Sequence, residues 1–211
     1  MIITTQHGKG DKIHIYADNE YRLTVDESYW LSLGIKEKSE IDEEAFSELE
    51  SSILRRRAFN KALDLLSSRE HCKKEIVTKL IQRGYDKEIA EETIEKLSDY
   101  GYIDDERFAS LFARELKQRK KFGKGRIKQE LLRKGIDRDI IENVLFEIED
   151  NPCEEIKELL ERKYPHFGED EKNRNRAINA LLRYGYRIQD IKKAMNSFDN
   201  SDSEYYDIEE Y

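Results

Sequence analysis

The residues best suited to metal binding or nucleophilic attack are the two cysteines and four histidines of the chain. His71 adjoins Cys72 and His166 lies beyond Cys153, so no Cys/His pair has the close spacing of a zinc site. The cysteines are far apart in sequence and stand in polar helical segments. This argues against a disulfide framework and favours a cytoplasmic location. We predict no metal and no cofactor.

Catalytic signatures are missing from the sequence as well. It contains no Gly-x-Ser-x-Gly, no pair of metal ligands on one helix face and no dinucleotide fingerprint. The glycines of Phe122–Arg126 do not form a Walker loop, because its spacing and its terminal Lys-Ser/Thr are absent. The carboxylates have helical spacing, for which a solvated face is the ordinary explanation. We expect a binding protein and not an enzyme.

Positive charge is the remaining chemical feature, and it is concentrated in residues 114–134. This stretch has ten basic and two acidic residues, hence a net charge of +8, in a chain whose overall charge is −8. Residues 1–54 have five basic and twelve acidic residues, and residues 150–211 have ten and fifteen. A polyanionic partner is therefore compatible with an isoelectric point near 5.3.

We interpret the 114–134 cluster as a contact surface, whereas scattered lysines are more simply a solvated helix face. Lys124 and its counterparts Lys73 and Arg174 each stand near the start of a helix, where a cation opposes the helix dipole, so something other than helix stability could retain it. The predicted partner- or DNA-binding residues are Lys73, Arg83, Arg114, Lys117, Arg119, Lys120, Lys121, Lys124, Arg126 and Lys128.

The elements that carry these cations are copies of one unit. Leu80–Asp86, Leu131–Asp137 and Leu181–Arg187 resemble one another, and their glycines are 51 and 50 residues apart. Apolar residues recur six, ten and thirteen positions after each glycine, which places them on one stripe of a helix. Each glycine can adopt the left-handed conformation that ends a helix, and Asp86 and Asp137, two residues after the first two glycines, can cap the next helix.

The predicted fold is mainly α: three tandem three-helix repeats in an elongated curved array, preceded by a small segment that contains a β-hairpin. The hairpin is expected from strands 12–16 and 21–25 around a turn at 17–20, and a further helix near Asp42 is expected to reach Arg55–Arg57. The helices of the repeats are expected at 57–67, 72–83, 87–99, 105–120, 124–134, 138–149, 153–163, 171–183 and 188–198.

The domain boundaries follow from this pattern. We expect a strand-containing extension at 1–55, repeats at 56–103, 104–150 and 151–198, and an acidic flexible tail at 199–211. The tail is either an inert solubilising end or a mask for the basic surface. No apolar run is long enough to span a membrane, and the start of the chain lacks the regions of a secretory signal.

Aromatic residues allow two interpretations. Tyr85, Tyr100, Tyr102, Phe108 and Phe112 could stack on nucleic-acid bases. They cluster around helix ends and the 100–112 junction, so we expect them to pack between neighbouring repeats.

Helix–turn–helix spacing raises the possibility of a gene regulator that reads the major groove. The two helices that would enter the groove, which follow Gly84 and Gly135, each carry a net charge of −4 with their capping aspartates. Phosphates would repel them, so we reject that arrangement.

Several motifs resemble those of the bacterial RecX regulatory proteins. Ala62–Glu70 with Leu80–Tyr85 is similar to their first repeat, and Tyr100–Ala109 is similar to their most recognisable motif. Lys121–Ile127 and Leu131–Ile136 are similar to the second repeat. The resemblance covers residues 57–198 and is most specific over 60–150, and the acidic tail departs from it.

The resemblance implies a partner and an action. Proteins of this family bind the RecA recombinase, chiefly as its filament on single-stranded DNA, and restrain its ATP hydrolysis, strand exchange and coprotease activity. We therefore expect a RecA-filament regulator in DNA repair and recombination that acts as a monomer, with weak direct DNA contact possible. Two alternatives stay open, a non-sequence-specific architectural DNA-binding protein and a scaffold for some other protein.

Overall fold

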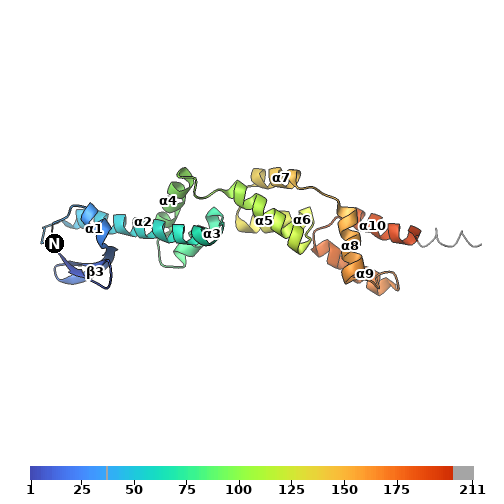
Figure 1. Ribbon diagram of the computed structural model, residues 1–211, viewed down its shortest axis with the longest axis horizontal. Helices are drawn as coiled ribbons and strands as arrows, with labels where there is room; N and C mark the ends of the chain where they lie inside the picture. The colour runs from blue at the N-terminus through green and yellow to red at the C-terminus, as the bar shows by residue number, and fades with distance from the viewer. Residues whose placement is uncertain (37, 202–211) are drawn as a thin grey trace, which may run out of the picture. The chain divides into compact units, whose positions relative to one another are not determined.

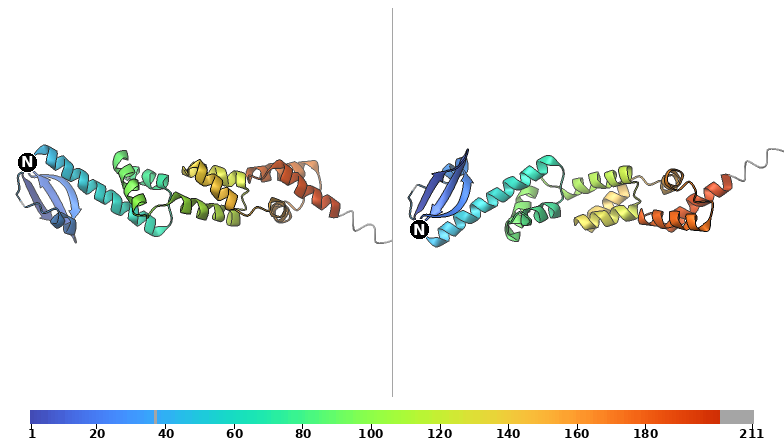
Figure 2. Two further views of the ribbon diagram at one scale, coloured as in Figure 1. Left: turned by 90° about the horizontal axis from the view of Figure 1, so that it is seen from above. Right: turned by 90° about the horizontal axis from the view of Figure 1, so that it is seen from below.

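The computed structural model describes residues 1–36 and 38–201, and the chain divides into two compact units. The first comprises Met1–Arg69 and Ile76–Tyr102, and the second comprises Glu70–Glu75 and the residues from Ile103 onward. Figures 1 and 2 show the helices and strands within each unit. Most of the predicted tail lies outside the described residues, so the expectation that it is flexible stays a prediction.

The first unit begins with a three-stranded antiparallel sheet of strands β1 (Ile3–His7), β2 (Lys12–Ala17) and β3 (Glu20–Asp26), in that order. The predicted hairpin is confirmed as β2 and β3, with Asp18 and Asn19 in left-handed conformations at the turn. Strand β1 was not predicted. Its fully buried side chain is Ile3 alone, so it lacks the alternation that marks a half-buried strand.

Helix α1 (Glu27–Ser32) follows the sheet, and α2 (Glu43–Ser68) packs on it. The side chain of Asp42 caps α2 by accepting a 2.7 Å hydrogen bond from the Ala45 amide. Phe46, Leu49 and Ile53 of α2 are buried against the strands at helical spacing. One helix thus covers both the segment expected near Asp42 and the helix expected at 57–67.

Two shorter helices, α3 (Lys73–Ile81) and α4 (Lys87–Asp99), complete the first three-helix group. Gly84 has a φ of +88° and ends the turn after α3, as predicted. Asp86 stands at the N-cap of α4, but its side chain makes no capping hydrogen bond there. Ala90, Ile94 and Leu97 of α4 are buried, which confirms the helical stripe read from the repeat.

The second unit contains two three-helix groups, whose helices agree with the predicted ranges to within three residues at each end. These helices are α5 (Asp105–Lys120), α6 (Lys124–Lys134), α7 (Arg138–Glu147), α8 (Pro152–Lys163), α9 (Glu171–Arg183) and α10 (Ile188–Ser201). Equivalent side chains form the core of each group. Ile127 with Leu131 in α6, and Ala177 with Leu181 in α9, are fully buried at i,i+4 spacing. Each large aliphatic side chain contributes about 1.5–3 kcal/mol when buried.

The aromatic residues divide into two sets. Phe108 is buried in the core of the second unit, where it stacks on Phe112 with ring centroids 5.6 Å apart. The expectation of packing between repeats was wrong for Tyr100 and Tyr102, which are 66% and 51% exposed. Tyr100 instead packs edge-on against Phe59 of its own unit, and Tyr102 packs edge-on against Tyr100. Both tyrosine rings lie on the surface.

The described part of the chain has no helix both long and apolar enough to cross a membrane. Nor do its residues bring together three His, Cys, Asp or Glu side chains that could hold a metal ion.

Candidate functional site

The basic cluster is built around a joint between two helix ends in the second unit. The amide of Gly123, at the N-cap of α6, donates a 2.8 Å hydrogen bond to the carbonyl of Tyr184, and the amide of Gly125 donates one of 3.3 Å to the carbonyl of Gly185. The positive end of the α6 dipole thereby meets the negative end of α9. This contact offsets the unfavourable placement of Lys124 at the start of α6.

Glycine is required at this joint for steric reasons. A β-carbon on Gly123 would lie 2.8 Å from the carbonyl oxygen of Gly185, and one on Gly125 would lie 2.9 Å from it. A β-carbon on Gly185 would lie 2.1 Å from the backbone nitrogen of Arg126. These distances are shorter than any real contact, so the two backbones approach closely only because all three side chains are absent. The glycines inside the basic stretch therefore serve the joint.

Ion pairs surround the joint, and many cations of the predicted basic cluster take part in them. Lys117, with 12% of its side chain exposed, lies 2.7 Å from a carboxylate oxygen of Glu155 and 3.1 Å from one of Asp150. Lys121 lies 3.0 Å from Glu158, and Lys124 lies 3.6 Å from Asp150. The acidic partners belong to α8 and to the segment before it.

Tyr186 closes the joint from the side of α9. Its hydroxyl lies 3.0 Å from both the Glu155 carboxylate and the Lys121 carbonyl, either of which can accept its hydrogen. Burial, together with the nearby negative charge of Glu155, raises the pKa of Tyr186 well above its usual range. The phenol therefore stays neutral and acts as a hydrogen-bond donor.

A second, related joint involves the segment Glu70–Glu75. Cys72 occupies the position equivalent to Gly123, and its thiol donates a 3.2 Å hydrogen bond to the carbonyl of Lys134. Burial raises the pKa of this thiol, which suits a structural residue better than a reactive one. Lys134 in turn forms an ion pair with Glu75, and Arg107 binds both carboxylate oxygens of Glu70 at 3.0 and 3.3 Å.

The ten predicted site residues therefore separate by environment. Arg126 pairs with Glu130 at 2.9 Å and Lys128 pairs with Glu142, so both cations are largely neutralised within repeat 2. Arg119 pairs with Glu115 at 3.2 Å but keeps 77% of its side chain exposed. Arg83 belongs to the first unit, where it donates a 3.2 Å hydrogen bond to the Lys79 carbonyl.

Three of the predicted cations remain available to a partner. Arg114 and Lys120 on α5 and Lys73 at the start of α3 are exposed, and their side chains form no ion pair with the described residues. Arg114, Lys120 and the weakly held Arg119 are the exposed cations in the C-terminal half of α5, where they project in different directions around the helix, and we call the three together the α5 patch. A solvent-exposed pair such as Arg119–Glu115 contributes only a few tenths of a kcal/mol, so a partner carboxylate or phosphate can replace Glu115.

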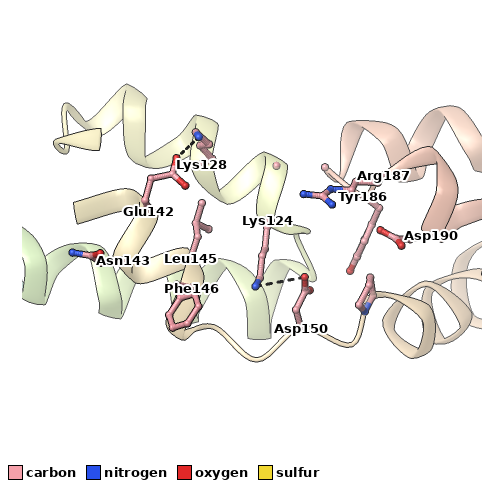
Figure 3. A pocket seen from close by; sticks show the side chains of 13 residues that line it. Lys124, Lys128, Glu142, Asn143, Leu145, Phe146, Asp150, Tyr186, Arg187 and Asp190 are labelled. Carbon is pink, nitrogen blue, oxygen red and sulfur yellow. Dashed lines mark hydrogen bonds and ion pairs between the residues drawn. The ribbon is translucent and has the colours of Figure 1, made fainter. Parts of the chain in front are cut away.

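A hollow of about 770 Å³ lies beside the joint (Figure 3). It is lined by residues from the start of α6, the end of α7, the α7–α8 segment and the turn before α10, and these residues include Lys124, Lys128, Glu142, Phe146, Asp150 and Arg187. In Figure 3, Lys124 points toward Asp150 and Lys128 toward Glu142, and the aromatic ring of Phe146 lies at the edge of the hollow.

Phe146 was absent from the predicted site. It is 90% exposed, although it stands in a helix whose other exposed residues are polar. The sequence did hold a signal, because the equivalent positions of the other two repeats are Glu95 and Asn196. A position that is polar in two copies of the repeat is a solvent-facing position. An apolar residue at that position in the third copy is therefore expected to face solvent as well.

Comparison with known proteins agrees with this architecture. Residues 58–97 match the model of the first three-helix domain of RecX, and residues 104–145 match that of the second. The chain is 33% identical to the regulatory protein RecX of Caldanaerobacter subterraneus subsp. tengcongensis, over 93% of this chain and 99% of that protein. It is 30% identical to the regulatory protein RecX of Bacillus subtilis, over 96% of this chain and 78% of that protein.

Two crystal structures share the fold. One, of a regulatory protein RecX, has a TM-score of 0.70 at 24% identity and covers 92% of this chain and 98% of its own. The other, of RecX from Lactobacillus salivarius, has a TM-score of 0.61 at 26% identity and covers 69% of this chain and 97% of its own.

Proposed function

The chain belongs to the RecX family, and from this premise we propose that it binds the RecA filament on single-stranded DNA and restrains the filament's ATP hydrolysis, strand exchange and coprotease activity. In this proposal the chain acts as a cytoplasmic monomer and catalyses no reaction. The family alone suggests the partner. We propose that the contact lies at the α5 patch.

The α5 patch is the observation that supports the proposal. Most cations of the 114–134 stretch are held by Asp150, Glu155, Glu158 and other carboxylates of the same unit. Arg114, Arg119 and Lys120 are exposed and can meet an acidic protein surface or a DNA phosphate. Complementary charge of this kind speeds association and fixes orientation more than it adds affinity.

Rigidity within the second unit favours a periodic partner. The glycine joint holds repeat 2 and repeat 3 through backbone hydrogen bonds and the partly buried ion pair between Lys117 and Glu155, so the spacing of these two repeats is fixed. A pair of repeats at fixed spacing can bind two adjacent protomers of a filament at no added cost of ordering.

The test is the single-stranded-DNA-dependent ATPase rate of RecA from the same organism, with this protein titrated in. We expect inhibition at well below one copy per RecA, because a regulator in a filament groove or at a filament end affects many protomers. An unchanged rate, with filaments confirmed by electron microscopy, would overturn the proposal.

An architectural DNA-binding protein is the second candidate, since the α5 patch would also suit a bare phosphate backbone. Such a protein would bind naked single-stranded DNA as tightly as the filament, and its affinity would fall steeply with salt concentration. Titrations of both forms of DNA at two salt concentrations separate the two functions. Tighter binding to the filament favours the regulator.

A further inference from the structure

Phe146, in the last turn of α7, is the most exposed large apolar side chain of the described residues. It is 90% exposed, and the next is Leu31 at 70%. Single exposed apolar residues are common on protein surfaces, so exposure alone does not identify a contact. The internal repeats supply the missing comparison.

The three repeats show that the fold does not need an aromatic residue at this position. Phe146 stands eleven residues after Gly135, and the residues eleven after Gly84 and Gly185 are Glu95 and Asn196. Both of these polar side chains are exposed in helices equivalent to α7. Since the same helix forms with Glu or Asn, packing within the chain does not account for the phenyl ring.

The surroundings of Phe146 indicate the chemistry of whatever covers it. The charged residues that line the hollow balance, since Lys124, Lys128 and Arg187 stand against Glu142, Asp150 and Asp190. Glu147 and Glu149 are exposed beyond them and form no ion pair with the described residues, so the end of α7 carries a net negative charge. This negative charge would repel a DNA backbone, which makes base stacking unfavourable. A protein surface with an apolar pocket and a rim of Lys or Arg is complementary to both the ring and the carboxylates.

We propose that Phe146 anchors a contact with a protein partner, in which the ring enters an apolar pocket that has a cationic rim. The inference rests on the proposed function, because we identify the partner as a protomer of the RecA filament and not as its DNA. The α5 patch would then contact an acidic surface of the partner, and the Phe146 end of α7 would contact a basic one. A buried aromatic anchor of this type commonly dominates an interface.

The experiment compares Phe146→Asn with Leu31→Asn in the full chain. Phe146→Asn introduces the residue that repeat 3 carries, and Leu31→Asn removes an exposed apolar side chain from α1 of the first unit. Binding is measured to RecA filaments assembled on a single-stranded oligonucleotide with a non-hydrolysable ATP analogue, and separately to the bare oligonucleotide. Circular dichroism confirms that both variants keep the helix content of the wild type.

We expect Phe146→Asn to raise the Kd for the filament by about 10- to 30-fold, with no change for bare DNA and no effect of Leu31→Asn. An unchanged filament Kd overturns the inference, as does an equal loss in both variants. A matching loss on bare DNA also overturns it, since the ring would then stack on bases. A wild-type protein that fails to bind filaments would instead refute the proposed function, and this inference with it.

Discussion

The amide of Gly123 donates a 2.8 Å hydrogen bond to the carbonyl of Tyr184, so the start of α6 is capped by the end of α9. Helix ends ordinarily leave four amides or four carbonyls without partners inside the helix. Here two such ends satisfy each other across a boundary between repeats. Backbone contacts therefore set the spacing between repeat 2 and repeat 3, and the side chains that flank this joint determine how stable it is.

Gly185→Ala is expected to disrupt the joint, with Gly84→Ala as the matched control. Both glycines have a φ of +88°, so each substitution carries a backbone strain of about 1 kcal/mol. Only at Gly185 does the added methyl collide with the Arg126 backbone, since nothing lies within 4 Å of a methyl at Gly84. Hydrogen exchange in α6 and α9 should accelerate by at least tenfold more in Gly185→Ala. Equal effects of the two variants would contradict a tight joint.

Lys117→Met is expected to destabilise the second unit by roughly 2 kcal/mol, because it removes the cation that Glu155 and Asp150 share at a partly buried position. Arg119→Met removes a cation from the same helix, but its pair with Glu115 is exposed, and the expected loss is below about 0.5 kcal/mol. Urea unfolding followed by circular dichroism measures both. A loss of the same size in both variants would show that the ion pair of Lys117 is as exposed in solution as that of Arg119.

Alkaline pH is expected to weaken the joint through Tyr186. The pKa of its phenol is raised in the folded state by burial and by the carboxylates of Glu155, Asp150 and Glu158, whereas the unfolded phenol ionises near pH 10. Above that pH the unfolded state releases a proton that the folded state keeps, so stability falls as pH rises. The stabilising contribution is thus fully present below pH 10 and is lost progressively as the pH rises from 10 toward the higher pKa of the folded state.

Tyr186→Phe provides the comparison, because the two proteins differ in this one titratable group. The free energy of unfolding of the variant should be about 1 kcal/mol lower at pH 7, because the hydrogen bonds of the phenol are missing. It should also fall less steeply between pH 10 and 11. Thermal unfolding at pH 7, 9, 10 and 11 gives both slopes. Parallel slopes would mean that the phenol is solvated in the folded protein.

Charge reversal should separate binding from folding within the basic stretch. Arg114→Glu with Lys120→Glu changes two exposed cations, and we expect at least tenfold weaker filament binding with unchanged thermal stability. Lys121→Glu with Lys124→Glu places carboxylates against Glu158 and Asp150, so this pair should lower the unfolding temperature. If only the second pair weakens binding, the α5 patch is not the contact surface.

Local patterns predicted most of the secondary structure because helix periodicity, glycine stops and aspartate caps are properties of neighbouring residues. Asp137 accepts a hydrogen bond from the amide of Asp139, as its place two residues after Gly135 indicated. Strand β1 was missed because its pairing with β2 supplies the stability that its own sequence does not signal. The candidate site was predicted less well, since charge counts do not show which carboxylate lies opposite which cation.

The sequence by itself determined the repeat, the helices and the family, because these depend on the order and spacing of residues along the chain. Only the tertiary structure decided that Lys117, Lys121 and Lys124 stabilise a joint while Arg114 and Lys120 remain exposed. Their acidic partners lie 26 to 38 residues away along the chain and meet them only because the glycine joint brings the start of α6 to the end of α9. The physical reason is that ion pairing depends on distance in space.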